Sequence, residues 1–244
     1  MRVRMNISYN GRDFSGFQYQ HDYRTVQGTI EKQLKRMHKM PTRIHGASRT
    51  DAGVHALDQY IHFDTTIDLP GDKWAIIFNR AMPDDIYIKN VDIVDNDFHS
   101  RYHAKGKTYR YKIYTGAKNP FYKGLVTHVP DQLDISKIKE AAKDFVGVHD
   151  FTTFSSAKAE IKNKIREIKQ VDIIQTEAGL DIVITGTGFL YNMVRIIVAY
   201  LLEVGRGLRK ADTLNMIAQK DRTIIPKTAP AEGLYLEKVW YENL

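Results

Sequence analysis

The sequence predicts an α+β fold made of two similar halves that share one continuous, mainly antiparallel sheet with a cleft at its centre. The order strand, helix, strand, strand, helix, strand can be followed through residues 1–105 and again, with little residue-level similarity, through residues 106–244. No low-complexity linker separates the two parts. We therefore expect an N-terminal half, 1–105, and a C-terminal half, 106–244, that pack as one body.

The first half opens with an alternation of apolar and polar residues at 2–9, which is typical of a half-buried strand and stops at Asn10-Gly11. Apolar residues at three- and four-residue spacing then predict an amphipathic helix over residues 25–39, ending before Pro41. The other elements expected in this half are strands over 43–48, 57–63 and 86–94 and a helix over 72–81.

The second half repeats the series with longer connections. Its expected elements are strands over 107–114, 165–176, 180–185 and 234–241 and helices over 135–146 and 189–204. Segment 189–204 is the most apolar stretch of the chain, but it is short for a bilayer span and carries Arg195 and Glu203. We expect a buried core helix there, and each half resembles the sheet-and-two-helices layout of RNA-recognition modules.

The amino-acid composition excludes some classes of functional site. The chain of 244 residues has no cysteine, which excludes disulfides, thiolate metal sites and a cysteine nucleophile. The N-terminus lacks the apolar run of a signal peptide, so we expect a cytoplasmic protein without a membrane segment. A net charge of +7 is compatible with a polyanionic partner such as nucleic acid and does not by itself establish one.

Asp51 is the first candidate for chemistry. It lies in the turn-like segment Arg49-Thr50-Asp51-Ala52-Gly53 between two expected strands, with a cation two residues before it and a glycine two residues after it. Such a carboxylate can serve as a nucleophile or a base. A lone aspartate in this setting more often caps backbone N–H groups, so a second observation is needed.

Arg195 supplies that second observation. It is embedded among aliphatic residues on the expected core helix, and a buried cation needs a counter-ion unless its side chain reaches the surface. An acidic loop residue such as Asp51 is the natural partner, and the pair would keep the carboxylate ionised inside a dry pocket.

Aromatic residues mark the strand over 107–114. Tyr109, Tyr111 and Ile113 share one strand face, and Arg110 and Lys112 share the other. Tyrosines on a sheet can stack on RNA bases, and they can equally form part of a core.

Two further patterns favour cofactor sites only weakly. Gly186-Thr187-Gly188 lacks the third glycine and the ribose-binding acid of a dinucleotide site. His99 and His103 have the spacing of two metal ligands on a helix, but the glutamate of the zinc-protease pattern is absent and their neighbours favour a loop. We expect neither a cofactor nor a metal.

Several strings occur in an order that resembles the tRNA pseudouridine synthase A family, whose members isomerise uridines at nucleotides 38 to 40 of the anticodon stem-loop. The strings span nearly the whole chain, and eight in order are far more specific than any one of them. They are YNG with FSGFQ, TVQG, RTDAGVHA, FHSRY, KTYRY, DF, FLYNMVR and APAEGL.

The resemblance implies roles for particular residues. Asp51 matches the family's catalytic aspartate, and Arg49 the arginine that helps to extrude the target nucleotide. Tyr109 matches the tyrosine that stacks on the target base, Arg195 the arginine paired with the catalytic carboxylate, and Leu234 a residue lining the pocket. The resemblance also implies a homodimer that binds tRNA and an isomerase that needs no cofactor.

The competing hypotheses are a non-catalytic RNA-binding protein on the same scaffold and a metal-dependent nuclease. The first would not need Asp51 opposite Arg195, and the second would need clustered carboxylates and a divalent ion. Whether Asp51 attacks C1′, attacks C6 or removes the 2′ proton is left open by the sequence.

Overall fold

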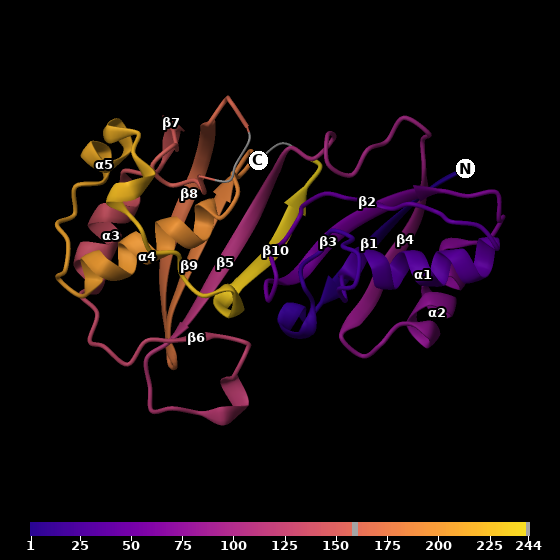
Figure 1. Ribbon diagram of the computed structural model, residues 1–244, viewed down its shortest axis with the longest axis horizontal. Helices are drawn as coiled ribbons and strands as arrows, with labels where there is room; N and C mark the ends of the chain where they lie inside the picture. The colour runs from indigo at the N-terminus through magenta and orange to yellow at the C-terminus, as the bar shows by residue number, and fades with distance from the viewer. Residues whose placement is uncertain (158–160, 243–244) are drawn as a thin grey trace. The chain divides into compact units, whose positions relative to one another are not determined.

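The computed structural model describes residues 1–157 and 161–242, and Figure 1 traces the chain. The residues group into two compact units. The first contains Met1–Lys105 together with the chain from Tyr235 onward, and the second contains Gly106–Leu234. The strands belong to one mainly antiparallel sheet, and we describe the strands and helices of each unit in turn.

The sheet of the first unit has the strand order β4-β1-β3-β10. β1 (Arg2–Tyr9) lies antiparallel between β3 (His55–Asp64) and β4 (Ile86–Val94). β10 (Leu234–Trp240) runs parallel to β3, with Tyr235 opposite His55, and the two-residue β2 (His45–Gly46) pairs with β3 over another part of its length. Every second side chain of β1 is buried, as the alternation in its sequence predicts.

Two helices complete the first unit. α1 (Val26–His38) begins where the Thr25 side chain accepts a hydrogen bond from the Gly28 N–H, and it ends at Lys39, which has a left-handed backbone. α2 (Gly71–Ala81) buries Trp74, whose ring meets Phe63 of β3 edge-on with 5.6 Å between the centroids. The apolar faces of both helices therefore form the core of this unit with one side of its sheet.

The sheet of the second unit has the order β5-β9-β8-β7, and all of these neighbours are antiparallel. The strands are β5 (Gly106–Tyr114), β7 (Gly147–Asp150), β8 (Ile165–Thr176) and β9 (Gly179–Gly186). A two-residue strand, β6 (Thr127–His128), runs parallel to the end of β5.

The helices of the second unit are α3 (Ile135–Lys143), α4 (Met193–Gly205) and the short α5 (Thr213–Gln219). Every residue of α4 except Arg195 is buried, which confirms the expected core helix. α4 begins at Met193 rather than at 189, because Asn192 has a left-handed backbone (φ 60°) that does not continue a helix. Among the described residues, no helix is long and apolar enough to cross a membrane.

The predicted α+β class with a mainly antiparallel sheet is confirmed, and the strand and helix order of each half is the expected one. Some details differ. The strand expected over 43–48 is reduced to β2, and β6, β7 and α5 were not predicted. β10 follows the second half in sequence but joins the first unit, because its partner in that unit is β3.

Candidate active site

Asp51 lies on a loop in which the residues on either side of it are held by hydrogen bonds. Thr50 is buried, and its Oγ1 lies 2.7 Å from the hydroxyl oxygen of Tyr9 in β1. Its carbonyl oxygen accepts a hydrogen bond from the Phe17 N–H at 3.0 Å, and the Gly53 N–H donates to the Phe14 carbonyl at 3.2 Å. Asp51 itself is half-buried. The carboxylate is therefore presented by a backbone that is held on both sides.

The start of the same loop is held by a fully buried amide. The Gln59 side chain of β3 accepts a hydrogen bond from the Ser48 N–H at 3.0 Å and donates to the Ser48 carbonyl at 2.8 Å. This pair of bonds reproduces a strand-like pairing with a side chain. Arg49, the next residue, is exposed.

Close backbone packing explains two glycines next to this loop. A Cβ on Gly11 would lie 1.9 Å from the Val54 carbonyl oxygen, so only glycine fits there. The N–H of Gly11 donates to Nδ1 of the buried His55 at 3.1 Å. Gly16 has a φ of 93° and faces the backbone of 50–52. Both contacts press segment 11–17 against the Asp51 loop.

The second unit carries Arg195 in the first turn of α4. Its Nε donates to the Ala229 carbonyl at 2.7 Å, and its Nη1 donates to Oδ1 of Asn192 at 3.1 Å. The Ala229 N–H returns a hydrogen bond to the Arg195 carbonyl at 3.1 Å. The guanidinium is thus half-buried and oriented by groups of its own unit rather than extended freely into solvent.

Tyr109 and Tyr111 differ in their surroundings, although both lie on the same face of β5. Tyr111 is fully buried, and its hydroxyl donates to the Pro230 carbonyl at 2.8 Å and lies 2.6 Å from Oγ1 of Thr127. Burial raises the pKa of the Tyr111 hydroxyl above its usual range. Tyr109 is 7% exposed and meets Phe189 edge-on at 5.1 Å. Tyr111 is a core residue, and Tyr109 lies at the margin of that core.

Leu234 is buried and follows a 3-10 turn over Ala231–Gly233. A Cβ on Gly233 would lie 2.8 Å from the Tyr111 ring, so the turn lies directly against that ring. Tyr111 and Arg195 therefore both hold the chain segment that leads to Leu234, one through Pro230 and the other through Ala229.

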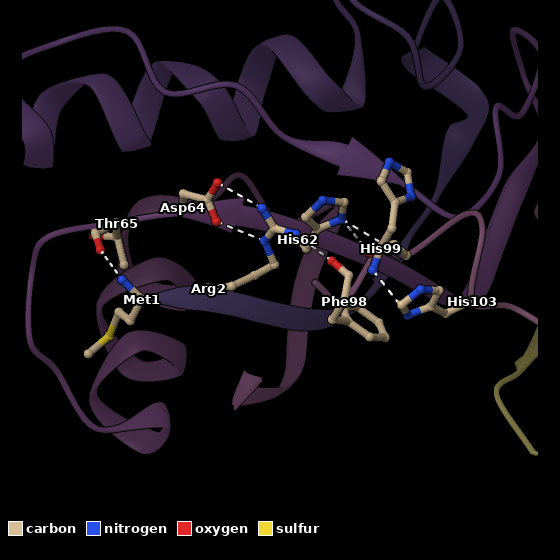
Figure 2. Close-up of polar contacts among 9 residues, drawn as sticks. Met1, Arg2, His62, Asp64, Thr65, Phe98, His99 and His103 are labelled. Atoms are coloured by element: carbon tan, nitrogen blue, oxygen red, sulfur yellow. Dashed lines mark hydrogen bonds and ion pairs between the residues drawn. The ribbon is translucent and has the colours of Figure 1, made fainter. Parts of the chain in front are cut away.

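A cluster of histidines orders the loop over 98–103 of the first unit (Figure 2). Nδ1 of His62 accepts a hydrogen bond from the Ser100 N–H, and Nδ1 of His99 accepts from the Arg101 N–H at 3.1 Å. Nδ1 of His103 in turn accepts from the His99 N–H at 3.4 Å. A ring nitrogen that accepts an N–H carries no proton, so His62 and His99 are arranged here as neutral rings.

Electrostatics favour the same neutral state. Burial, followed by the neighbouring His99 and His45, lowers the pKa of His62 to about 4, and burial lowers the pKa of His99 as well. Arg2 adds a fixed positive charge nearby. Its Nη1 donates to the Phe98 carbonyl at 2.7 Å, and its guanidinium pairs with Asp64. His99 and His103 thus act as acceptors for loop N–H groups. Within 1–157 and 161–242, no group of three or more acidic or histidine side chains is arranged to hold a metal ion.

A sequence model of the family described as tRNA pseudouridine synthase matches residues 5–103 and 141–242. The chain belongs to this family. The match includes the Asp51 loop, the 98–103 loop and α4, whose geometry is described above. It leaves out residues 104–140, which contain β5 and Tyr109.

Relatives of this family support the assignment along the whole chain. The protein named tRNA pseudouridine synthase A of Staphylococcus saprophyticus is 54% identical over 242 residues, which cover 98% of this chain and 91% of the relative. The protein of the same name from Staphylococcus aureus strain Newman is 50% identical, with 100% and 92% covered. The archaeal box H/ACA sRNP Nop10-Cbf5 complex contains a chain with a TM-score of 0.35 and 10% identity, covering 82% of this chain and 44% of that one, and this likeness carries no argument for the site.

The candidate residues are thus divided between the two units. Asp51 and Arg49 lie on one loop of the first unit, whereas Tyr109, Arg195 and Leu234 lie in the second. The pairing of Asp51 with Arg195 stays a prediction. Sequence reasoning named Tyr111 as a stacking or core aromatic, and it is core, and it named His99 and His103 only as weak metal candidates. It did not identify the supporting roles of Tyr9, Gln59 and His62.

Proposed function

We propose that this protein isomerises uridine to pseudouridine in the anticodon stem-loop of tRNA, at nucleotides 38 to 40, with Asp51 as the catalytic carboxylate. The observation that carries the proposal is the fixed loop around Asp51. Its neighbour Thr50 forms hydrogen bonds with Tyr9 and Phe17, and Gly53 forms one with Phe14. A structure that holds the flanks of one carboxylate in this way limits its freedom before substrate arrives, which is what a nucleophile or base requires.

Besides this carboxylate, the reaction requires few chemical groups from the protein. The N1–C1′ bond of the target uridine breaks, the uracil turns, and a new bond forms between C5 and C1′. The C5 proton is lost to solvent and N1 gains a proton, so that atoms and electrons balance without an oxidant or an external nucleophile. Asp51 would start the sequence at C1′, at C6 or at the 2′ proton, and the remaining groups would hold the detached base in place.

The other proposed roles follow from position and chemistry. Arg49 is exposed next to Asp51, where a guanidinium can occupy the space that an extruded nucleotide leaves in the RNA stem. Tyr109 would stack on the target base, and the buried Leu234 would line the pocket. Arg195, held by Ala229 and Asn192, would supply the positive charge that keeps Asp51 ionised.

We also propose a cytoplasmic homodimer that needs no cofactor, with one tRNA contacting both subunits. In that arrangement one subunit would bind the body of the tRNA while the other holds the target. Light scattering of the active protein tests the assembly. A mass twice the 28.1 kDa of the chain is expected, and full activity at the monomer mass would refute the dimer.

The function itself is tested by tritium release. Purified protein is incubated in EDTA with tRNA that carries tritium at C5 of uridine, and the released tritium is measured together with the position of the pseudouridine. Release with modification at 38 to 40 is expected. A protein that binds tRNA without releasing tritium would be the non-catalytic RNA-binding protein instead, and cleaved tRNA that appears only after a divalent ion is restored would indicate a nuclease.

A further inference from the structure

An open pocket of about 250 Å³ lies in the first unit, beside the Asp51 loop. Its lining includes three arginines, Arg43, Arg49 and Arg101, and the aromatic residues Tyr19 and Tyr102. No aspartate or glutamate lines it. A cavity bounded by cations and aromatic rings has the chemistry of a nucleotide site, because phosphates bind guanidinium groups and bases stack on rings.

The three arginines are available to a ligand. All three are exposed, and none of them forms an ion pair with an acidic residue of the described chain. Other arginines of this unit are already engaged, such as Arg2 with Asp64 and Arg24 with Asp85. Three uncompensated positive charges around one cavity repel each other, and an anion in the cavity removes that repulsion.

Tyr102 is presented to solvent in a fixed orientation. The residue is 74% exposed, yet one side of the ring lies against the His99 imidazole, with 4.3 Å between the centroids and 35° between the planes. His99 in turn lies 4.6 Å from His62 of β3. Tyr102 is therefore the outermost ring of a set of packed rings that begins inside the unit.

The loop under Tyr102 is held by hydrogen bonds at several points. The Ser100 carbonyl accepts from the Tyr241 hydroxyl at 2.8 Å, and the Phe98 carbonyl accepts from Arg2, which Figure 2 shows beside His62. The N–H groups of 99–102 donate to the three histidine rings described above. Fixing the loop and one ring contact of an exposed tyrosine in advance reduces the entropy that stacking would otherwise lose.

We infer that this pocket binds an unpaired ribonucleotide of the substrate RNA close to the target uridine, with its base on Tyr102 and its phosphates between Arg43 and Arg101. The inference rests on the proposed function for the identity of the RNA. Arg49 lines the pocket and stands two residues before Asp51, a span of at most about 7 Å of extended chain, so the bound nucleotide is a near neighbour of the target. The protein would thus hold the RNA at two points, the target and its neighbour.

The experiment compares two pocket variants with two matched controls in the full-length protein. The pocket variants are Tyr102→Ala and Arg101→Gln, and the controls are Tyr87→Ala on β4 and Arg80→Gln on α2, which are exposed and outside the pocket. Each is measured for tRNA affinity and for single-turnover pseudouridine formation at saturating tRNA.

We expect tRNA binding to weaken about tenfold in each pocket variant, the scale of one stacked base or one charged phosphate contact, with a rate at saturation within about threefold of the wild type. The control variants should bind as the wild type does. Pocket variants that behave like their controls, in a preparation that does form pseudouridine, would overturn the inference.

A direct binding measurement tests the pocket independently of whether the protein forms pseudouridine. Tryptophan fluorescence of Tyr102→Trp should be quenched when anticodon stem-loop RNA is added, beyond any change in the wild type or in Tyr87→Trp. This measurement needs binding but no turnover, so it remains decisive if the wild type forms no pseudouridine. A weakened Arg101→Gln together with an unquenched Tyr102→Trp would mean a phosphate contact only, and would overturn the nucleotide pocket.

Discussion

The hydroxyl of Tyr9, at the end of the first strand, lies 2.7 Å from the hydroxyl of Thr50, the residue before the proposed catalytic aspartate. Both residues are buried, so the Thr50 hydroxyl left alone would lack compensation from water. We predict that Tyr9→Phe lowers the free energy of unfolding by about 1 kcal/mol and slows single turnover several-fold through a looser Asp51 loop. Thermal unfolding and single-turnover kinetics check the two effects.

A double-mutant cycle with Thr50→Val tests whether the hydrogen bond is responsible. The two substitutions should be strongly non-additive in rate, because each removes the same bond. Tyr9→Phe with full turnover would show that the Asp51 loop is held well enough by its backbone bonds to Phe14 and Phe17.

The role of Asp51 is tested by Asp51→Asn, which keeps the shape of the side chain and removes its charge. We predict that turnover falls by at least about a thousandfold, as for loss of a nucleophile or base, while tRNA affinity stays the same or rises slightly. Asp13→Asn is the matched control, since Asp13 is an exposed carboxylate on the neighbouring 3-10 turn. Residual turnover near the wild-type rate would assign the chemistry to another group.

The role of Arg195 is tested by Arg195→Met and Arg195→Lys across pH. Methionine keeps much of the apolar stem and removes the charge, so turnover should fall about a hundredfold at neutral pH, the scale for removing one partner of a desolvated charge pair. The acid limb of the pH–rate profile should move to higher pH, with partial recovery in alkaline buffer.

Arg195→Lys separates charge from geometry in the proposed pair of Arg195 with Asp51. Lysine keeps the charge but not the two-pronged donation to Ala229 and Asn192, so its acid limb should stay in place even if its rate falls. If the turnover rate of Arg195→Met is lower than that of the wild type by the same factor at every pH, Arg195 only positions groups.

The lowered pKa of His62 predicts that the stability of the protein depends on pH. Its pKa in the folded protein, about 4, lies below the ordinary value of 6.5, so the unfolded chain takes up the proton first as the pH falls. Stability from the neutral ring is therefore present above pH 6.5 and is lost between 6.5 and about 4, by about 3 kcal/mol in total. Denaturant unfolding of the wild type at a series of pH values should show this slope.

His62→Asn should flatten that slope, because the amide oxygen can accept the Ser100 N–H and does not titrate in this range. His21→Asn is the control, since the His21 side chain is 86% exposed. An unchanged slope in His62→Asn would assign the dependence to His99 or to another group.

Local sequence patterns were sufficient for most elements of this fold. The caps of α1 illustrate why, since Thr25 binds the helix start through its own side chain and the apolar spacing identifies the buried face. Short elements such as β7 and α5 were missed because four to seven residues hold too little periodicity. The partner of β10 was also beyond prediction, because strand pairing between distant residues leaves no local signal.

The site shows the same division between local and distant information. Asp51 could be selected from its own loop and from the family strings, but the residues that hold this loop are Tyr9, Phe17 and Gln59, which come from three separate segments. The histidine cluster is a stronger case, since His45, His62 and His99 meet only when two strands and a loop have folded. Only the fold could reveal that the 98–103 loop is built to present Tyr102.

The parallel pairing of Tyr235 and Leu236 with His55 and Ala56 sets an order on biosynthesis. A ribosome releases the first hundred residues long before it makes β10, so the nascent first unit must wait through the synthesis of the second unit with the His55–Ala56 end of β3 unpaired on that side. Exposed strand edges of this kind invite pairing with other chains. Chaperones that bind the chain during its synthesis would therefore encounter a first unit that still lacks a strand.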